Sequence, residues 1–129
     1  MEARRLMQRL LDTSVLIDVL RGDENAVAFV AALDDVPLCS EITRIEVLRG
    51  LRSAERGSTS RLLGELEWHP MDRLVARRAG ELGRRWRRSH PGIDTADLAI
   101  AATAELTGSE LATTNVRHFP MLDGLEPPY

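Results

Sequence analysis

The amino-acid sequence predicts an α/β fold in which a small parallel sheet is flanked by helices. Short apolar runs typical of strands alternate along the chain with segments whose apolar residues follow helical spacing. This alternation is typical of a parallel sheet covered by helices. The length of 129 residues suits one domain, so we predict a single domain over residues 1–129.

The composition is that of an ordinary folded protein, with 43% hydrophobic and 29% charged residues. A single cysteine, Cys39, excludes an internal disulfide. The apolar runs are far shorter than the roughly 18 residues of a membrane span, and the N-terminal segment does not resemble a signal peptide. We therefore expect a cytoplasmic protein with no membrane partner.

The first predicted unit is a strand followed directly by a helix. Leu6, Met7, Leu10 and Leu11 predict a short buried strand, and helical spacing begins at Thr13. The elements expected next are a helix that starts at 23–25, a strand over 36–40 and a helix from 43. Residues 57–60 are expected to end that helix and to cap a short one that follows.

The helix expected at residue 43 is predicted from a capping motif. Residues 43–46 match the pattern S/T-x-x-E, which places Glu46 in the first turn. Ile45, Leu48 and Leu51 recur every third residue and are the expected buried side.

The second half of the chain continues the alternation. Val75, Ala79, Leu82 and Trp86 form the apolar stripe of a predicted basic helix. The elements expected there are a strand over 67–71, that helix over 72–89, an apolar helix that follows 93–97 and ends at Gly108, a strand over 111–114, a turn at 115–120 and an irregular tail.

All 17 basic residues are arginines, and seven of them fall within residues 73–88 against one acid, Glu81. Such a local excess suits contact with phosphates. A solvated helix face, or an arginine-rich coding bias, explains it equally well. The candidates for nucleic-acid contact are Arg77, Arg84, Arg85 and Arg88.

Three acids recur at predicted helix starts. Asp12 lies where the first strand gives way to a helix, a ligand-binding position in α/β folds, although Asp is also a common helix cap. Glu46 and Asp97 each occupy the third position after a candidate cap, Asp94 in the second case. The positive end of a helix dipole favours an ionised carboxylate at each position.

If these carboxylates converge, their mutual repulsion favours a bound divalent cation. Oxygen ligands suit Mg²⁺ or Mn²⁺, which activates water and stabilises charge on a phosphoryl oxygen. Zinc is not indicated, because the cysteine and the histidines lack paired ligand spacing and are more typical of structural or surface positions. These residues are Cys39, His69, His90 and His118.

Four motifs, at 10–20, 42–51, 94–104 and 111–119, together resemble those of PIN-domain proteins and, more closely, of the VapC toxins of type II toxin–antitoxin pairs. The resemblance implies a PIN-like three-layer α/β/α fold with a small central parallel sheet. It implies a Mg²⁺- or Mn²⁺-dependent endoribonuclease that cleaves tRNA or rRNA and inhibits translation and growth. It also implies a cognate antitoxin, an RNA substrate and a homodimer.

Position by position, the resemblance assigns Asp12, Glu46 and Asp97 as catalytic metal ligands. Asp94, Thr13, Ser14 and Asn115 are assigned supporting roles, either contacting metal or holding its ligands, and for Asp94 we favour a helix cap. Asn115 stands where many relatives have Asp, which predicts a weaker second metal site. The alternative is a catalytically weak or inactive PIN module that binds antitoxin or RNA.

Overall fold

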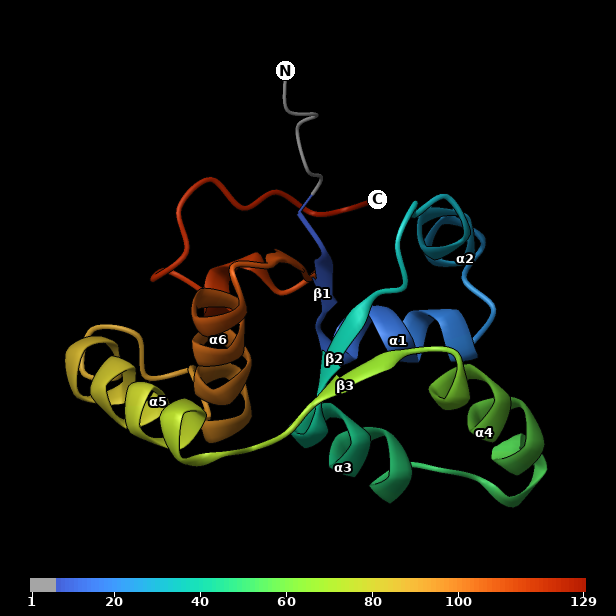
Figure 1. Cartoon of the computed structure of the whole chain (residues 1–129), viewed down its shortest axis with the longest axis horizontal. Coiled ribbons are helices and arrows are strands. Elements are labelled where there is room, and N and C mark those ends of the chain that lie inside the picture. Colours follow the sequence, from blue (N-terminus) through green and yellow to red (C-terminus); the bar gives the residue numbers. More distant parts are fainter. Residues whose placement is uncertain (1–6) are drawn as a thin grey trace.

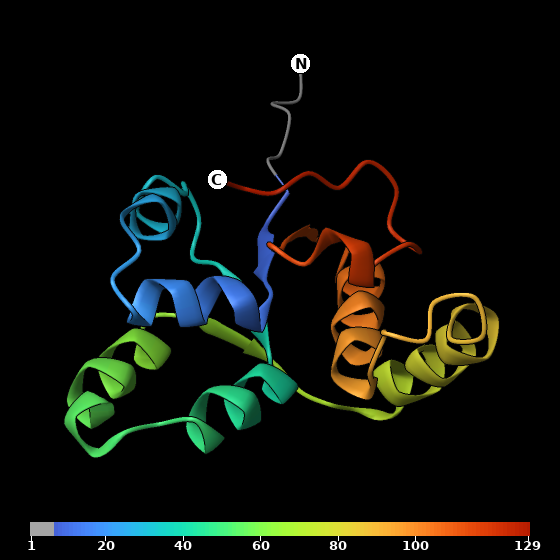
Figure 2. The same cartoon turned by 180° about the vertical axis from the view of Figure 1, so that it is seen from behind.

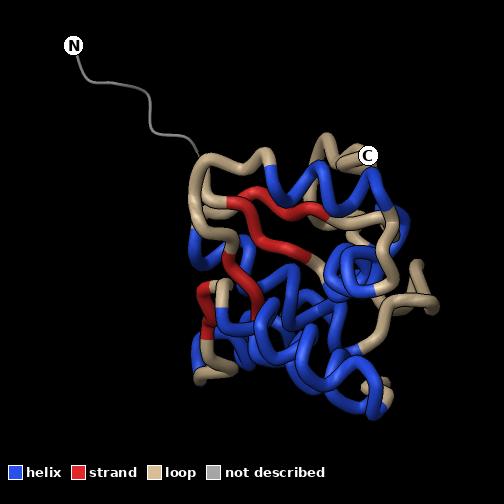
Figure 3. The backbone as a smooth tube through the Cα atoms, turned by 90° about the vertical axis from the view of Figure 1, so that its right-hand side faces the viewer, coloured by secondary structure: helices blue, strands red, loops and turns tan. Residues whose placement is uncertain are grey.

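The protein is described by a computed structural model over residues 7–129, and it has the predicted α/β architecture. Four short strands form one sheet in the order β3-β2-β1-β4, and every neighbouring pair is parallel. Figure 3 shows the strands in red among the helices. The strands are β1 (Arg9–Leu11), β2 (Leu38–Ser40), β3 (Glu67–His69) and β4 (Glu110–Ala112).

Helices connect the strands, as a parallel sheet requires. Figure 1 shows them on both sides of the sheet. The α-helices are α1 (Thr13–Leu20), α2 (Glu24–Ala31), α3 (Glu41–Arg49), α4 (Arg56–Gly64), α5 (Arg73–Trp86) and α6 (Thr95–Thr107), and the 3₁₀ helices are η1 (Ser53–Glu55) and η2 (Val116–His118).

The two faces of the sheet bury separate cores because successive strand residues point to opposite sides. On one face, Leu10 packs with residues of α5 and α6. On the other, Leu11 packs with α1, α3 and α4. Each fully buried leucine contributes about 1.5–3 kcal/mol relative to an exposed one. Two helical layers with the sheet between them confirm the predicted α/β/α arrangement.

Helices α5 and α6 form the layer that the sequence pattern predicts best. Val75, Ala79 and Leu82 of α5 are buried as expected. A Cβ at Gly83 would lie 3.0 Å from Leu98 Cδ1, so the absence of a side chain there lets the two helices approach closely. Helix α6 ends at Gly108, whose φ of 65° is in the left-handed region that favours glycine.

The start of α3 differs from the prediction. The helix begins at Glu41, directly after β2, and its cap is the Ser40 hydroxyl, which accepts the backbone N–H of Ile42 (3.2 Å). The buried side of α3 consists of Thr43, which contacts Thr13 of α1, and Val47, so the expected buried stripe was wrong. Its members Ile45 and Leu48 are 58% and 47% exposed, and Leu51 is half-buried.

Two other boundaries also differ from expectation. The first strand begins at Arg9 and Met7 is 55% exposed, while Leu6 lies outside the described residues. Residues 57–60 lie inside α4 rather than before it, because α3 has already ended at Arg49.

The C-terminal tail crosses the molecule from the α6 side to the α1–α2 side (Figures 1 and 2). Its last residue, Tyr129, donates a hydrogen bond from its hydroxyl to Asp18 Oδ2 (2.6 Å). The Tyr129 and Phe29 rings lie 6.0 Å apart. These contacts link α1 and α2 to the C-terminus and leave the opposite, carboxyl edge of the sheet uncovered by the tail.

Candidate active site

The predicted acids lie at the carboxyl edge of the sheet. The strand order places β1 between β2 and β4, so the chain changes direction across the sheet beside β1. Ligand sites of open α/β sheets occur at such a switch point. Asp12 follows β1, while Glu46 lies on α3 after β2 and Asp97 lies in the first turn of α6.

Asp12 is held by side-chain hydroxyls. It stands at the N-cap position of α1, yet its carboxylate makes no capping hydrogen bond. Instead, Oδ2 accepts hydrogen bonds from Ser14 Oγ (2.7 Å) and Thr113 Oγ1 (2.8 Å). The residue is only 3% exposed. The helix-cap interpretation is therefore wrong for this side chain, and Oδ1 receives no protein donor within residues 7–129.

Glu46 reaches the site from the middle of α3 rather than from its first turn. Because α3 begins at Glu41, the helix dipole has little effect at this position. Oε1 accepts a hydrogen bond from Thr13 Oγ1 (2.6 Å), and that hydroxyl is also hydrogen bonded to Thr43 (3.0 Å). Oε2 lies 3.6 Å from Nη2 of Arg49, whose side chain is 72% exposed, so this ion pair is weak.

Asp97 and Asp94 form the predicted capping box of α6. Asp94 Oδ1 accepts the Asp97 N–H (2.9 Å), and Asp97 Oδ2 accepts the Asp94 N–H (3.1 Å). His118 Nδ1 lies 3.2 Å from the same Oδ2. Burial raises the pKa of Asp97 to about 6, and the neighbouring Asp94 charge also raises it. The cap role favoured for Asp94 is thus observed.

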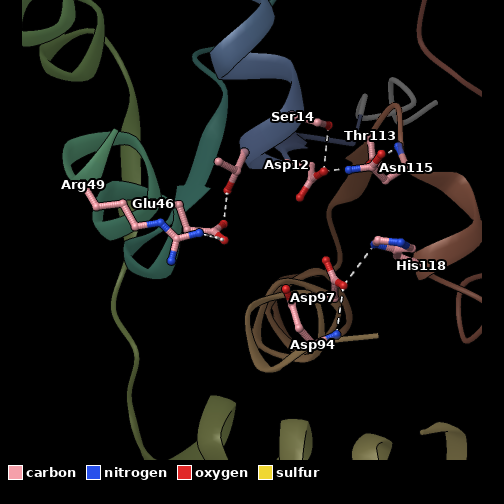
Figure 4. Close-up of polar contacts among 10 residues, drawn as sticks. Asp12, Ser14, Glu46, Arg49, Asp94, Asp97, Thr113, Asn115 and His118 are labelled. Carbon is pink, nitrogen blue, oxygen red and sulfur yellow. Dashed lines mark hydrogen bonds and ion pairs between the residues drawn. The ribbon is translucent and has the colours of Figure 1, made fainter. Parts of the chain in front are cut away.

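The three carboxylates surround a common space, and each comes from a different element (Figure 4). Asp12 and Asp97 each bind protein donors through one oxygen and leave the other without a donor among the described residues. The arrangement is open: in residues 7–129 no three Asp, Glu, His or Cys side chains are close enough to hold a metal ion as they stand. Metal binding requires a closer approach of these carboxylates.

The predicted supporting residues lie around the acids. Thr13 holds Glu46 and Ser14 holds Asp12. Asn115 is exposed and lies beside Thr113 (Figure 4); its backbone N–H donates to Thr113 Oγ1 (2.9 Å).

Thr113 and His118 contact the acids although sequence reasoning assigned them no role. A threonine directly after a strand, as Thr113 follows β4, is a signal that it lies at the carboxyl edge of the sheet. No spacing rule links His118 to Asp97.

The arginines proposed for nucleic-acid contact are exposed: Arg77, Arg84 and Arg85 on α5, which lies beyond α6 from the sheet (Figure 1), and Arg88 in the turn after α5. Arg78 is engaged by Glu105 (2.6 Å) and Glu81 (3.2 Å). Within the described chain no ion pair engages the candidates Arg77, Arg84, Arg85 and Arg88, and Arg85 lies over the Trp86 ring.

The fold is that of a known family. The PIN domain family profile matches residues 9–124, so the chain belongs to the PIN-domain family. It is 41% identical to ribonuclease VapC19 of Mycobacterium tuberculosis, over 94% of this chain and 99% of the relative. Identity to ribonuclease VapC10 of the same species is 45%, over 93% of this chain and 92% of the relative. Within the family, the chain is therefore a member of the VapC group.

A solved structure supports the same assignment. A toxin–antitoxin complex from Klebsiella pneumoniae contains a chain that is 28% identical, with a TM-score of 0.82. The match covers 95% of this chain and 98% of that chain. Separately, none of the helices within residues 7–129 is both long and apolar enough to span a membrane.

Proposed function

We propose that this protein is a divalent-metal-dependent endoribonuclease and the toxin of a type II toxin–antitoxin pair. One observation carries the proposal: three carboxylates from three elements surround one space at the switch point of the sheet (Figure 4). Membership of the VapC group, whose compared relatives are named ribonucleases, supports RNA as the substrate.

Asp12, Glu46 and Asp97 would hold Mg²⁺ or Mn²⁺. The donor set fits such a cation because hard divalent ions prefer carboxylate oxygens, and Asp12 and Asp97 each present an oxygen that no described protein donor engages. When bound, the cation supplies charge stabilisation at phosphoryl oxygens and acidifies water. These two effects would promote hydrolysis of a phosphodiester bond within RNA, which produces two new RNA ends.

The surrounding residues orient the acids. Ser14 and Thr113 fix Asp12, and the backbone N–H groups of Thr114 and Asn115 in turn donate to those two hydroxyls (3.2 and 2.9 Å). Thr13 fixes Glu46. Preorganised acceptors of this kind reduce the reorganisation needed during the reaction.

Asn115 would contribute an uncharged amide oxygen where an aspartate would contribute a charge. We propose that a single cation dominates, because loss of one negative charge weakens any second site.

A cognate antitoxin and a second copy of the chain are the proposed protein partners. The Klebsiella pneumoniae relative is a toxin–antitoxin complex, which supports the antitoxin. Ile45, Leu48 and Leu74 are 58%, 47% and 61% exposed and supply apolar surface that suits protein contacts. The proposed cellular outcome is cleavage of tRNA or rRNA in the cytoplasm, with inhibition of translation and growth.

An RNA-cleavage assay tests this function. The purified protein should cut members of a panel of structured tRNA and rRNA fragments with Mg²⁺ or Mn²⁺, stop in EDTA, and resume when metal is restored. Asp97→Asn should abolish cleavage, whereas Asp34→Asn, at an exposed acid outside the site, should not. Cleavage that survives in EDTA or in Asp97→Asn would overturn the mechanism.

The alternative is a PIN module that binds antitoxin or RNA without turnover. Two observations favour it: the described carboxylates are not grouped tightly enough to hold a metal, and Asn115 lacks the charge of an aspartate. An active wild-type protein in the assay above excludes this alternative.

A further inference from the structure

A cavity of about 310 Å³ opens beside the acid site. Glu46 and Val47 form part of its wall, so the cavity and the acid site share a side chain. It lies among α1, α3 and α4, which are neighbours in Figure 1. A polymer bound with one phosphodiester at the acids would therefore have its next units at this opening.

The cavity has an aliphatic wall and a basic rim. Ile17, Leu20 and Leu51 are half-buried and line it, while Arg21 and Arg52 are exposed beside it. No carboxylate in residues 7–129 forms an ion pair with either arginine.

The acidic part of the lining is already engaged. Glu55 Oε1 accepts the Arg52 backbone N–H (3.1 Å), and Glu46 accepts the Thr13 hydroxyl. Because neither carboxylate forms an ion pair with Arg21 or Arg52 in residues 7–129, the guanidinium groups at the rim remain available to an anion.

We propose that this cavity receives one unstacked nucleobase of the RNA strand that is cut at the acid site. The inference rests on the proposed ribonuclease function and adds a specificity subsite to it. The faces of a base are apolar and suit the aliphatic wall, whereas the flanking phosphates suit Arg21 and Arg52. Proteins that read RNA bind bases splayed out from loops and single strands. The cavity thus selects for an unpaired nucleotide at a fixed position next to the cut.

Gly50 allows the cavity to be filled without backbone strain. Its φ is −97°, which other residues adopt, and a Cβ there would meet only the carbonyl oxygens of Glu46 and Val47 at 3.9 Å. Gly50→Leu therefore places a side chain at the cavity wall. Gly80→Leu is the matched control, because a Cβ on that glycine of α5 has no neighbour within 4 Å in the described chain.

The experiment uses RNA oligonucleotides that span a cut mapped with the wild-type protein. Binding of a fluorescein-labelled oligonucleotide is measured by anisotropy in an Asp97→Asn background, with an abasic nucleotide placed at each position in turn. We expect one abasic position to weaken binding roughly tenfold, which is in the lower part of the range for a base that stacks on an aromatic side chain. Gly50→Leu should weaken binding of the intact RNA to a similar extent and remove the effect of the abasic nucleotide at that position. Gly80→Leu should retain the wild-type affinity and the abasic effect.

Melting curves check that each variant is folded. If Gly50→Leu is not folded, Arg21→Gln combined with Arg52→Gln should weaken RNA binding in the Asp97→Asn background. The same pair in protein that retains Asp97 should leave Mn²⁺ affinity unchanged. Unaltered RNA binding and an unaltered abasic profile in a folded Gly50→Leu variant would overturn the nucleobase proposal. Cleavage by the wild-type protein would still support the ribonuclease function in that case. Loss of antitoxin binding alone would instead make the cavity a protein-docking site. A wild-type protein that cuts no RNA would overturn both proposals.

Discussion

Thr113 donates a hydrogen bond from its hydroxyl to Asp12 Oδ2 at 2.8 Å, although 101 positions separate the two residues. The contact joins the carboxyl ends of β1 and β4, which pair in parallel. Thr113 is fully buried, and its oxygen accepts the Asn115 N–H. The orientation of Asp12 therefore depends on the segment that follows the last strand.

Thr113→Val should lower both stability and metal affinity. Valine keeps the shape but removes the hydroxyl, which leaves a buried carboxylate oxygen with one donor fewer. We expect the free energy of unfolding in urea to fall by about 1–2 kcal/mol, and Mn²⁺ to bind more weakly. Thr114→Val, at the exposed neighbouring position, is the control and should change neither quantity. Equal effects at the two positions would show that the Asp12 contact has no special role.

Asp97 should make stability depend on pH. Because burial raises its pKa from 3.8 to about 6, the native state binds more protons than the unfolded state between these values. The free energy of unfolding should therefore fall as pH rises through this window and be lowest, for this group, above it. Asp97→Asn should remove that dependence, so the stability of the variant relative to wild type should increase as pH rises through this window.

Urea denaturation on both sides of the window measures this effect, with Asp34→Asn as the exposed control. The same titration predicts that Mn²⁺ affinity rises with pH through about 6, since a protonated carboxyl is a poor metal ligand. If wild type and Asp97→Asn lose the same stability across the window, the raised pKa is refuted.

Asn115→Asp should strengthen metal binding. The substitution adds a negative charge beside Thr113 and Asp12 (Figure 4). Unit charges 4 Å apart in water attract each other by about 1 kcal/mol, and a divalent ion is attracted more strongly. We therefore expect Mn²⁺ affinity to increase roughly fivefold to tenfold. Calorimetry measures the affinity and the number of ions bound. An unchanged affinity would indicate that position 115 does not face the cation.

The arginines at the C-terminal end of α5 and in the turn after it provide a test of RNA contact away from the acids. Arg84→Gln combined with Arg88→Gln should weaken RNA binding and lower the slope of log affinity against log salt by roughly one to two, because each phosphate contact contributes about 0.7–0.9. Arg61→Gln, at an exposed arginine of α4, serves as a control. An unchanged slope would leave the basic face as a solvated helix surface.

Local sequence patterns predicted most of the fold. The β1–α1 junction, α5 and α6 follow from apolar periodicity and, for α6, from the capping residue Asp94, whose partner Asp97 is three residues away in the chain. The α/β/α layers follow from the alternation of these elements. Such short-range signals are read directly from the sequence.

The start of α3 shows where local signals fail. Two helix starts compete there, and Ser40 caps the helix because β2 ends at that residue. The Thr-x-x-Glu pattern at 43–46 does not cap the helix. The Thr43 and Glu46 side chains lie on the side of α3 that contacts Thr13. The end of β2 therefore decides between two locally acceptable helix starts.

The site could be predicted in part. The Asp94–Asp97 capping box is local, and the resemblance of the motifs picks out the three acids. The hydroxyl network around Asp12 and the contact of His118 with Asp97 join distant segments, so no spacing within one motif indicates them. Whether the acids approach closely enough to hold a metal depends on side-chain positions that a sequence does not contain.

Calorimetric titration of Mn²⁺ into the purified protein tests the central claim most directly. We predict saturable binding to wild type, loss of that binding in Asp12→Asn and in Asp97→Asn, and full retention in Asp34→Asn. Retained binding in both site variants, or no binding to wild type at millimolar Mn²⁺, would contradict the claim that these carboxylates form the metal site.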